Sequence, residues 1–372
     1  MLVGVPKEVK VHEYRVGLTP DSVRELVHQG HEVLVQAGAG EGIGADDAAY
    51  ETAGARMTAE APEVFALADM VVKVKEPQPA ECRMLRPGQL LFTYLHLAPD
   101  PGQAQGLLRS GCTAIAYETV TDARGQLPLL APMSEVAGRM AVQVGAVALQ
   151  KAGGGRGVLL GGVPGVPPGD VLVIGGGTVG THAARMAAGL GARVTVLDRS
   201  LPRLRELDEL FQGRACTQYA TLHALEAALE RADLVIGAVL VPGAAAPKLV
   251  RRDMLARMRP GAVVVDVAID QGGCFETSRP TTHDHPTYVE CGVVHYCVAN
   301  MPGAVARSSA HALNNATLPF VLDLAGKGWA RACAEDPQLL AGLNVHLGHI
   351  THPAVAQALG LPLLPARQAL AL

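Results

Sequence analysis

The sequence predicts an α/β fold in which two doubly wound, parallel-sheet domains face each other across a cleft and are joined by two long helices. Three observations support this prediction. Short apolar runs alternate with helical segments, as in parallel sheets whose strands are connected by helices. A glycine-rich strand–turn–helix pattern lies near the middle of the chain, at 171–187. The 372 residues are sufficient for two domains, and a long helical segment flanks the central part on each side.

The composition indicates a globular protein with large apolar cores. Apolar residues make up 49% of the chain and aromatic residues only 3%, so Val, Leu, Ala and Gly must fill the cores. The net charge of −4 without a basic stripe argues against nucleic-acid binding. The 7 cysteines are scattered, and neither a signal peptide nor a membrane-spanning run is visible. We therefore expect a cytoplasmic protein without disulfides, a structural metal or membrane contact.

The first part of the chain alternates between predicted strands and helices. A strand at 2–5 precedes a helix that is capped by Thr19, has Pro20 in its first turn and ends at Gly30. The other predicted elements of this part are strands at 31–35, 70–75, 89–96 and 113–118, and helices at 61–68 and 101–110. Strands separated by helices are expected to pair in parallel, with helices covering both faces of the sheet.

The central part is predicted to be a Rossmann-like nucleotide-binding domain. An apolar strand breaks into Gly175-x-Gly177-x-x-Gly180, a helix follows, and Asp198 closes the next apolar run. The glycines allow a tight turn and a close approach to a pyrophosphate, and the helix N-terminus offers N–H groups to its charge. Asp198 can accept hydrogen bonds from the adenosine ribose and would repel a 2′-phosphate. NAD is therefore favoured over NADP, although Arg199 beside Asp198 weakens this preference.

Two long helices are predicted to bracket this domain. One is capped by Ser134 and spans 135–151, and the other begins at 300–302 and extends towards Leu318. The Gly/Pro-rich segment at 153–169 is interpreted as a connector, although its backbone could also contact phosphates. Further strands of the central domain are predicted at 234–240, 262–268 and 292–298.

The C-terminal tail is too short to form a domain of its own. We therefore expect it to return to the first domain, so that the nucleotide-binding domain is inserted into a discontinuous partner. The predicted domains are a substrate-binding, catalytic domain at 1–129 plus 305–372 and an NAD-binding domain at 130–304.

Polar residues follow the predicted strands of both domains, at the positions where parallel sheets bind ligands. They are Arg15, Lys75, Tyr94, His96 and Glu118 in the first domain, and Asp198, Asp270 and Asn300 in the second. An arginine can donate two N–H groups to a carboxylate, a lysine can protonate or polarise a carbonyl, and a histidine can transfer protons. Asp270 can orient a charged amine or a histidine. With a nicotinamide as hydride acceptor, this set fits oxidation of a small amino or hydroxy acid.

The first-domain residues also have structural interpretations. Arg15 could pair with Glu13 or Glu8 on the surface. Lys75 could be a solvated strand end, and His96 could be a histidine packed in the core. The sequence alone does not choose between these interpretations and a site.

Two second-domain features have structural interpretations as well. Asp270 could cap a turn before Gly272 and Gly273. His283-Asp284-His285 lies in a loop bounded by Thr and Pro, without a third ligand at metal spacing. We interpret this motif as a solvated loop and predict no metal site.

A series of motifs extends over nearly the whole chain. They are Pro6-Lys-Glu, Glu13-x-Arg15-Val, Val74-Lys75-Glu-Pro, Tyr94-Leu-His96-Leu-Ala, Ala116-Tyr-Glu118-Thr, Leu130-Ala-Pro-Met133-Ser134-Glu, Leu160-Gly-Gly-Val-Pro-Gly, the glycine turn, Asp266-Val-Ala-Ile-Asp270-Gln-Gly-Gly and Val298-Ala-Asn300-Met-Pro-Gly-Ala. In this order they resemble the family that alanine dehydrogenase shares with the nucleotide-binding subunit of proton-translocating nicotinamide nucleotide transhydrogenase. So many motifs in one order are more specific than any single motif.

The resemblance implies reversible, NAD-dependent oxidative deamination of L-alanine to pyruvate and ammonia by a homo-oligomer, usually a hexamer. Arg15 and Lys75 would bind the substrate carboxylate and carbonyl, and His96 would be the catalytic acid and base. Asp270 would be the essential companion of His96 across the cleft. The implied substrate-binding residues are Arg15, Lys75, Tyr94, Met133 and Asn300. The expected NAD contacts are Ser134, Gly175, Gly177, Thr178, Val179, Gly180, Asp198, Arg203, Val239, Leu240, Val298 and Met301.

Three alternative functions remain open from the sequence. The chain could be a transhydrogenase-like module that docks onto a membrane partner, although that class usually lacks the His96 and Lys75 pair. It could be a protein that binds NAD without catalysis. It could also be a dehydrogenase of another small amino or imino acid, because the pocket size depends on packing around Tyr94 and Met133.

Overall fold

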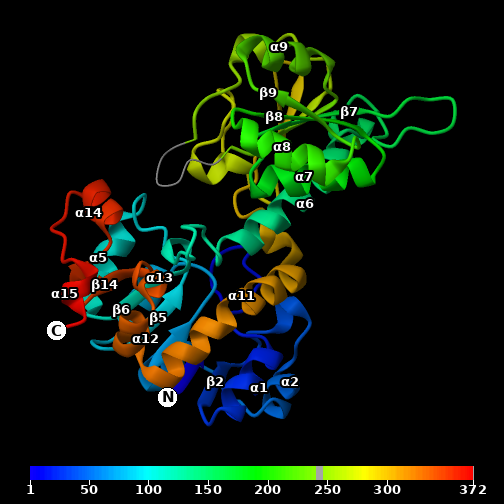
Figure 1. The fold of residues 1–372 in the computed structure, drawn as a ribbon. Coiled ribbons are helices and arrows are strands. Elements are labelled where there is room, and N and C mark those ends of the chain that lie inside the picture. Colours follow the sequence, from blue (N-terminus) through cyan, green and yellow to red (C-terminus); the bar gives the residue numbers. More distant parts are fainter. Residues whose placement is uncertain (240–245, 372) are drawn as a thin grey trace. The chain divides into compact units, whose positions relative to one another are not determined.

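The chain folds into two α/β units, each built on its own sheet (Figure 1). The computed structural model describes residues 1–239 and 246–371. The first unit combines Met1–Met133 with Gly303–Leu372, and the second unit is Ser134–Pro302. The predicted fold class, an α/β protein of two domains, is confirmed.

The first unit contains an eight-stranded sheet in the order β15-β14-β6-β5-β4-β1-β2-β3. Its strands are β1 (Leu2–Val5), β2 (Glu32–Gln36), β3 (Arg56–Thr58), β4 (Met70–Val72), β5 (Leu90–Thr93), β6 (Thr113–Ala116), β14 (Leu343–His346) and β15 (His349–Ile350). Strands β1 to β6 pair in parallel, whereas β14 is antiparallel to both β6 and β15. The C-terminal tail therefore returns to the first sheet, but as antiparallel strands that the sequence analysis did not predict.

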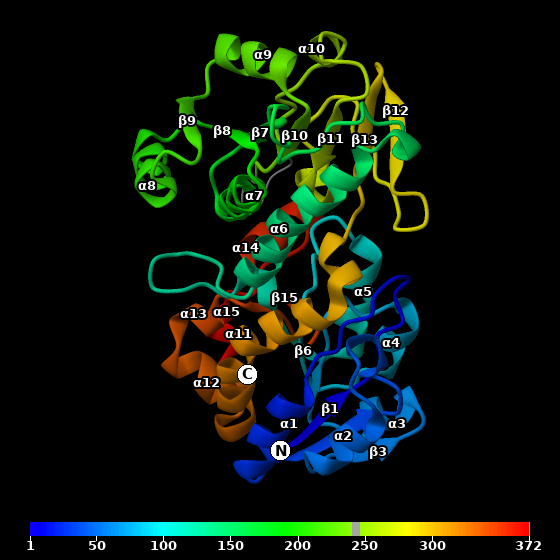
Figure 2. The ribbon, with the colours of Figure 1, turned by 90° about the vertical axis from the view of Figure 1, so that its right-hand side faces the viewer.

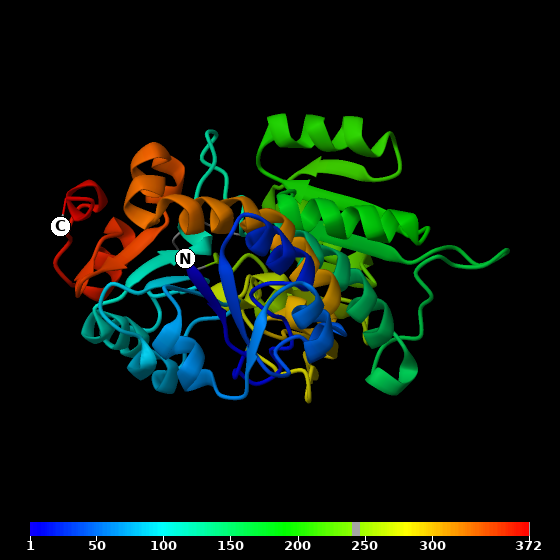
Figure 3. The same cartoon turned by 90° about the horizontal axis from the view of Figure 1, so that it is seen from below.

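Helices cover both faces of this sheet, with α4 and α5 on one side and α11 and α12 on the other (Figure 3). The α-helices are α1 (Pro20–His28), α2 (Asp47–Thr52), α3 (Ala61–Leu67), α4 (Pro79–Met84), α5 (Pro101–Ser110), α11 (Ala306–Lys327), α12 (Trp329–Glu335), α13 (Pro337–Leu340), α14 (Pro353–Leu359) and α15 (Ala366–Ala369). The Thr19 side chain caps α1 by accepting a hydrogen bond from the N–H of Ser22, as predicted. Phe65, Leu91 and Leu107 lie in the apolar core between the sheet and α3 to α5.

The second unit contains a seven-stranded sheet whose order, β12-β13-β11-β10-β7-β8-β9, can be followed in Figure 2. Its strands are β7 (Asp170–Ile174), β8 (Arg193–Asp198), β9 (Cys216–Tyr219), β10 (Leu234–Gly237), β11 (Val263–Asp266), β12 (Thr287–Glu290) and β13 (Val293–Tyr296). All pairs are parallel except the edge pair of β12 and β13. Phe275 and Val264 belong to its apolar core.

The helices of the second unit follow the strand–helix alternation expected of a nucleotide-binding domain. They are α6 (Ala131–Ala148), which begins just before this unit, α7 (Thr178–Gly189), α8 (Leu201–Phe211), α9 (Leu222–Arg231) and α10 (Arg252–Leu255), with shorter 3-10 turns at η4 (Val267–Gln271) and η5 (Met301–Val305). No helix within 1–239 and 246–371 is long and apolar enough to cross a membrane.

The two bracketing helices differ from their predicted limits. Helix α6 begins at Ala131, so Ser134 lies inside its first turn and is not the N-cap; Pro132 is tolerated there because the first N–H groups of a helix need no partner. Helix α11 continues to Lys327 through Pro319 instead of stopping near Leu318. Burial of Val321 beyond the proline favours this continuation.

Several strands are shorter than predicted, among them the two that precede Lys75 and His96. Strand β4 ends at Val72 and not at Lys75, and β5 ends at Thr93 and not at His96. Beyond these ends, side-chain carboxylates take over as acceptors for the backbone N–H groups: Glu8 accepts from Val74, and Glu118 accepts from Leu95 and His96. The apolar pattern of the sequence continues beyond the strand ends because Val74, Tyr94 and Leu95 stay buried there.

Candidate functional site

Three loops place polar side chains at one edge of the first sheet. Arg15 follows β1, Lys75 follows β4, and both Tyr94 and His96 follow β5. These strands are parallel neighbours, so their carboxyl ends lie at the same edge, where such sheets bind ligands. All four residues belong to the site predicted from the sequence, and Met133 joins them through a contact with Arg15.

Arg15 is held in a buried, two-pronged ion pair. Its Nε and Nη2 donate to Oε1 and Oε2 of Glu13 at 2.6 and 2.5 Å, and its Nη1 lies 3.1 Å from Sδ of Met133. The Arg15 side chain is 2% exposed and that of Glu13 is fully buried, so the interpretation of a surface pair is wrong. Burial opposes the charge, but the bonds to Glu13 prevail and raise the pKa of Arg15. The fork therefore stays charged with a fixed orientation.

Lys75 lies in a turn whose backbone is fixed on both sides. Its N–H points to Oε1 of Glu8 at 3.4 Å, and its carbonyl accepts a hydrogen bond from the Thr93 hydroxyl at 3.0 Å. The side chain is only 15% exposed, with Nζ 3.9 Å from Oε2 of Glu76, so Lys75 is not a solvated strand end. Burial acts to raise the pKa of Glu76, but Lys75 and Lys10 together lower it.

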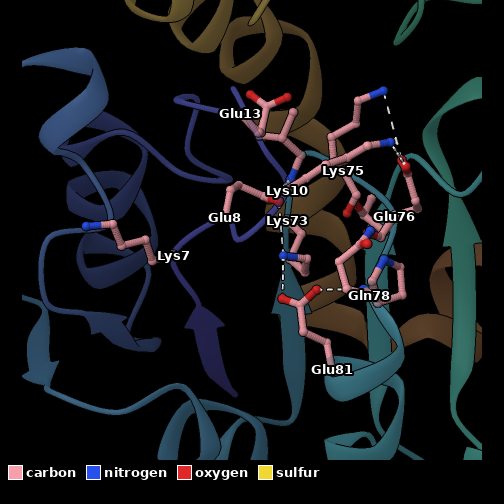
Figure 4. A network of polar contacts seen from close by, with 12 residues as sticks. Lys7, Glu8, Lys10, Glu13, Lys73, Lys75, Glu76, Gln78 and Glu81 are labelled. Carbon is pink, nitrogen blue, oxygen red and sulfur yellow. Dashed lines mark hydrogen bonds and ion pairs between the residues drawn. The ribbon is translucent and has the colours of Figure 1, made fainter. Parts of the chain in front are cut away.

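A buried ionic cluster supports this turn (Figure 4). The ammonium of Lys73 donates to Oε2 of Glu8 at 3.1 Å and to Oε1 of Glu81 at 2.7 Å, and its side chain is fully buried. Burial raises the pKa of Glu8, against the opposing effect of Lys73. Burial acts to lower the pKa of Lys73, but the two carboxylates raise it. This cluster was not predicted from the sequence. The signal for it is a lysine inside an apolar strand segment, which requires a buried counter-charge.

Tyr94 lies buried behind His96. Its hydroxyl donates to the carbonyl of Leu129 at 2.5 Å, and its ring stacks on the His96 imidazole with 5.8 Å between centroids and 5° between planes. A second ring, that of Tyr117, meets it edge-on at 5.0 Å. Burial raises the pKa of Tyr94, so the hydroxyl stays neutral.

His96 is held by its backbone and presents its imidazole to solvent. Its N–H donates to Oε1 of Glu118 at 2.6 Å, and the N–H of Leu95 donates to Oε2 at 3.2 Å. The φ angle of His96 is 48°, a left-handed conformation that costs a non-glycine residue about 1–2 kcal/mol. The side chain is 44% exposed, with Nδ1 3.9 Å from Glu118, so His96 is not a histidine packed in the core.

The glycine turn of the second unit has the geometry that its spacing predicts. Gly175 has a φ of 99°, and a Cβ at Gly180 would lie 1.8 Å from the carbonyl oxygen of Gly175. A Cβ at Gly177 would meet no atom within 4 Å, so this glycine leaves open space at the start of α7. Thr178 and Val179 belong to the first turn of α7, and the N–H groups of this turn point out of the N-terminal end of the helix.

Two charged residues hold the peptide of Gly176. Oδ2 of Asp198 accepts from the N–H of Gly176 at 2.7 Å, and Nε of Arg203 donates to its carbonyl at 2.7 Å. Arg203 also donates to the Thr181 hydroxyl at 2.7 Å. Asp198 and Arg203 therefore shape the turn directly, and the second oxygen of Asp198 accepts from the Ser200 N–H at 2.8 Å.

The remaining predicted cofactor residues lie at several elements of the second unit. The side chain of Val239 packs against Gly175, and α6, which carries Ser134, contacts α7 where Gly138 meets the Val179 carbonyl. Val298 and Met301 are buried at 1% and 3% exposure. Leu240 lies outside the described residues.

Asn300, predicted to bind substrate, occupies a left-handed conformation with a φ of 60°. The carbonyl of Asn300 accepts a hydrogen bond from Nε2 of His283 at 3.3 Å, so this histidine supports the Asn300 turn. Among the residues that the structure describes, no group of three His, Cys, Asp or Glu side chains could hold a metal ion.

Asp270 is exposed on the 3-10 turn η4, and a neighbouring aspartate organises that turn. The buried Asp266 caps η4 by accepting from the Ala268 N–H at 3.1 Å, and it accepts from Cys274 N–H and Ser278 Oγ at 2.9 and 2.5 Å. Burial raises the pKa of Asp266, and these hydrogen bonds oppose the effect. The cap is therefore Asp266, the last residue of β11, and not Asp270, which stays exposed on η4.

Comparisons with known protein families cover both units. The N-terminal domain of alanine dehydrogenase/PNT matches residues 4–137, and the C-terminal domain of the same family matches residues 141–353. The chain is 64% identical over 361 residues to an alanine dehydrogenase of Halomonas elongata, with 97% of each chain covered. It is 58% identical over 362 residues to an alanine dehydrogenase of Mycobacterium tuberculosis, covering 97% of this chain and 98% of the relative.

Solved structures give the same result for the fold. An L-alanine dehydrogenase superimposes with a TM-score of 0.94 at 53% identity, covering 97% of this chain and 99% of the other. A transhydrogenase from Sinorhizobium meliloti superimposes with a TM-score of 0.81 at 27% identity, covering 95% of this chain and 100% of the other. The similarity therefore includes both units and the segments that connect them.

Proposed function

The chain belongs to the alanine dehydrogenase/PNT family, and from this premise we propose that it is an NAD-dependent L-alanine dehydrogenase. It interconverts L-alanine and pyruvate plus ammonia. One observation carries the proposal: a charged guanidinium, an ammonium and an imidazole share one edge of the first sheet. This set can bind a small 2-oxo or 2-amino acid and transfer its protons. The relatives named alanine dehydrogenase supply the substrate.

The residues of the second unit fit a dinucleotide. The open space at Gly177 and the left-handed Gly175 allow a pyrophosphate to approach the N-terminus of α7. Asp198 would hold the adenosine ribose, with Ser134, Val239, Val298 and Met301 as further contacts. NAD bound there would accept the hydride from the α-carbon of alanine.

The residues of the first unit would perform the remaining steps. Arg15 binds the substrate carboxylate, and its orientation is fixed by Glu13. Lys75 faces the oxygen or nitrogen on the substrate α-carbon, where its charge favours a polarised carbonyl. After oxidation of alanine to the imine, water adds to the α-carbon while His96 accepts a proton and then returns it to the departing nitrogen. The carbinolamine collapses to pyruvate and ammonia, so water supplies the carbonyl oxygen and the amine leaves.

The remaining assignments belong to the same proposal. The first unit would be the substrate domain and the second the NAD domain, with limits at 1–129 plus 305–372 and at 130–304. Tyr94 and Met133 would line the alanine pocket with Asn300, and Asp270 would be the companion of His96. A cytoplasmic location and a homo-oligomer, expected to be a hexamer, follow from the resemblance to the family.

A direct assay tests this function. NADH oxidation is followed with pyruvate and ammonium, and NAD and NADP reduction are followed in parallel with alanine and a panel of other amino acids. We expect alanine and NAD to give the highest kcat/KM. Turnover with a different amino acid would reassign the substrate, and NADH binding without turnover would indicate a non-catalytic protein. Hydride exchange between two nicotinamide nucleotides without any amino acid would favour a transhydrogenase-like module.

Two glycine variants separate cofactor binding from folding. Gly177→Ala is expected to weaken NADH binding about tenfold or more, because its methyl group enters the space left for the pyrophosphate. Its melting temperature should stay near that of the wild type, since the added Cβ meets no protein atom within 4 Å. Gly180→Ala should lower the melting temperature by about 4 °C or more, because its Cβ collides with the Gly175 carbonyl.

NADH fluorescence titration and thermal unfolding of both variants check this prediction. The assignment of the cofactor to this turn is contradicted if Gly177→Ala binds NADH like the wild type.

A further inference from the structure

We propose that Glu8 is a positioning residue that fixes the backbone of Lys75 and thereby the place of its ammonium group. The inference rests on the proposed function, which assigns Lys75 to the substrate. Glu8 itself is 9% exposed and lies under the turn, where it is part of the buried ionic cluster. It would act on the reaction only through Lys75.

The single carboxylate of Glu8 holds three consecutive residues. Oε1 of Glu8 accepts from the N–H of Val74 at 2.7 Å and faces the N–H of Lys75 at 3.4 Å. Oε2 of the same carboxylate accepts from the ammonium of Lys73 at 3.1 Å. Glu8 therefore sets the path of the chain from the end of β4 to the residue that is assigned to the substrate.

Glu8 replaces a neighbouring strand. Strand β1 pairs with β4 only at Val3 with Met70 and Gly4 with Val71, and β1 ends at Val5. Beyond that point the N–H groups on this side of the turn need another acceptor, since buried N–H groups are rarely left unpaired. The loop that follows β1 returns to this position and supplies the side chain of Glu8 instead.

The opposite side of the turn is fixed by β5 and the residue after it. The Thr93 hydroxyl donates to the carbonyl of Lys75 at 3.0 Å, and the N–H of Tyr94 donates to the carbonyl of Val74 at 3.3 Å. Glu8 and Thr93 thus hold the N–H and the carbonyl of the same residue. With its backbone fixed at both groups, Lys75 can move its ammonium only by rotation about its own side-chain bonds.

A carboxylate is required because the groups that its oxygens contact, the N–H groups of Val74 and Lys75 and the Lys73 ammonium, are all donors. In Glu8→Gln the amide oxygen can face either the Val74 N–H or the Lys73 ammonium, but the NH₂ group then faces the other donor. One of these contacts is lost in either orientation. In both orientations the new NH₂ group repels a donor that Glu8 held, so the side chain is displaced from beneath the turn. The turn should then shift by a fraction of an ångström, a displacement that can weaken the interaction with a reacting group strongly.

Glu81→Gln is the matched control. Glu81 is the other carboxylate on Lys73, and its second oxygen accepts from the N–H of Gln78 at 2.8 Å at the start of α4. Its described hydrogen bonds do not reach the peptide of Lys75. The two substitutions therefore remove one negative charge from the same ammonium, but only Glu8→Gln disturbs the Lys75 backbone.

Kinetics and hydrogen exchange of both variants test the proposal. Glu8→Gln is expected to lower kcat/KM for pyruvate about 10- to 100-fold, mainly through a higher KM for pyruvate, whereas Glu81→Gln stays within about threefold of the wild type. The Kd for NADH should be unchanged in both. The amides of Val74 and Lys75 should exchange about tenfold faster in Glu8→Gln than in Glu81→Gln.

Thr93→Val provides a second test if Glu8→Gln folds poorly. It removes the hydroxyl on the Lys75 carbonyl without changing any charge, and the same rise in the KM for pyruvate is expected. Equal kinetic losses in Glu8→Gln and Glu81→Gln, or unchanged kinetics in Thr93→Val, would overturn the positioning role. If the wild type does not use pyruvate, the proposed function fails, and unchanged exchange of the Val74 and Lys75 amides would separately overturn the anchoring by Glu8.

Discussion

His96→Ala is expected to lower kcat for pyruvate amination by about 10²- to 10⁴-fold, the usual contribution of a general acid and base. The imidazole is the exposed member of the polar set at the edge of the first sheet, and its backbone is fixed in a left-handed conformation by Glu118. Removing the ring leaves the buried Arg15 and its partner Glu13 in place. Substrate binding should therefore suffer less than turnover.

Steady-state kinetics with pyruvate, ammonium and NADH measure this effect, and the Kd for NADH should not change. His28→Asn is the control in the same unit, because His28 is an exposed residue at the end of α1. It should keep the kcat of the wild type. The catalytic assignment of His96 is wrong if His96→Ala is folded and turns over at a near wild-type rate.

Lys73→Met is expected to destabilise the first unit by about 3–5 kcal/mol near pH 8, because it leaves two buried carboxylates without their cation. The carboxylates of Glu8 and Glu81 each accept a hydrogen bond from the Lys73 ammonium. Methionine fills a similar volume, so the loss reports the charge and not a cavity.

The loss of stability in Lys73→Met should grow as the pH rises. Burial raises the pKa of Glu8 in the folded state, and removing Lys73 removes the main effect that opposes the rise. A carboxyl group whose folded pKa is raised does not lower the free energy of unfolding at a pH below its unfolded pKa of about 4.3, because it is protonated in both states. The free energy of unfolding then falls as the pH rises through the folded pKa, because the buried group must lose its proton. Lys73→Met should therefore be closest to the wild type at low pH and weakest at high pH.

Chemical denaturation at pH 5 and pH 8 measures both effects. Trp329 is the only tryptophan and contacts His346 at 4.6 Å between ring centroids, so its fluorescence reports unfolding of the first unit. Lys7→Met is the control, because Lys7 forms an exposed ion pair with Glu41 and should contribute less than about 1 kcal/mol. A loss for Lys73→Met that is equally small, or that grows as the pH falls, would contradict the prediction.

Local patterns predicted much of the fold. The helix at 101–110 and the strand at 2–5 have the limits expected from the sequence, and the cap of α1 is the expected Thr19. These features depend on neighbouring residues: an N-cap, a proline in the first turn and a continuous apolar run. The antiparallel strands β12, β14 and β15 were missed because each has at most four residues and lies at or next to a sheet edge, where its formation depends on a partner elsewhere in the chain.

The residues of the candidate site were predicted from the sequence, but the carboxylates that hold these residues in place were not. Arg15, Lys75 and His96 were identified as polar residues after apolar strands, and the structure brings them to one edge of the sheet. The carboxylates that hold them were not predicted in these roles: Glu8 was considered only as a surface partner of Arg15, and Glu118 only as a strand-end residue. A pattern that marks a strand end does not show which side chain will accept the last N–H groups.

The sequence by itself determined the glycine turn, because its glycine positions and Asp198 act within one strand–turn–helix unit and obey local steric rules. The resemblance of its motifs also identified the family, which the matches over both units confirm. Only the tertiary structure decided that Lys73 is buried between Glu8 and Glu81, and that Glu8 holds the turn of Lys75. Glu8 and Lys73 are 65 residues apart, and their contact exists because β1 and β4 are adjacent in the sheet. The pairing of strands sets such contacts, and no local pattern in the sequence contains it.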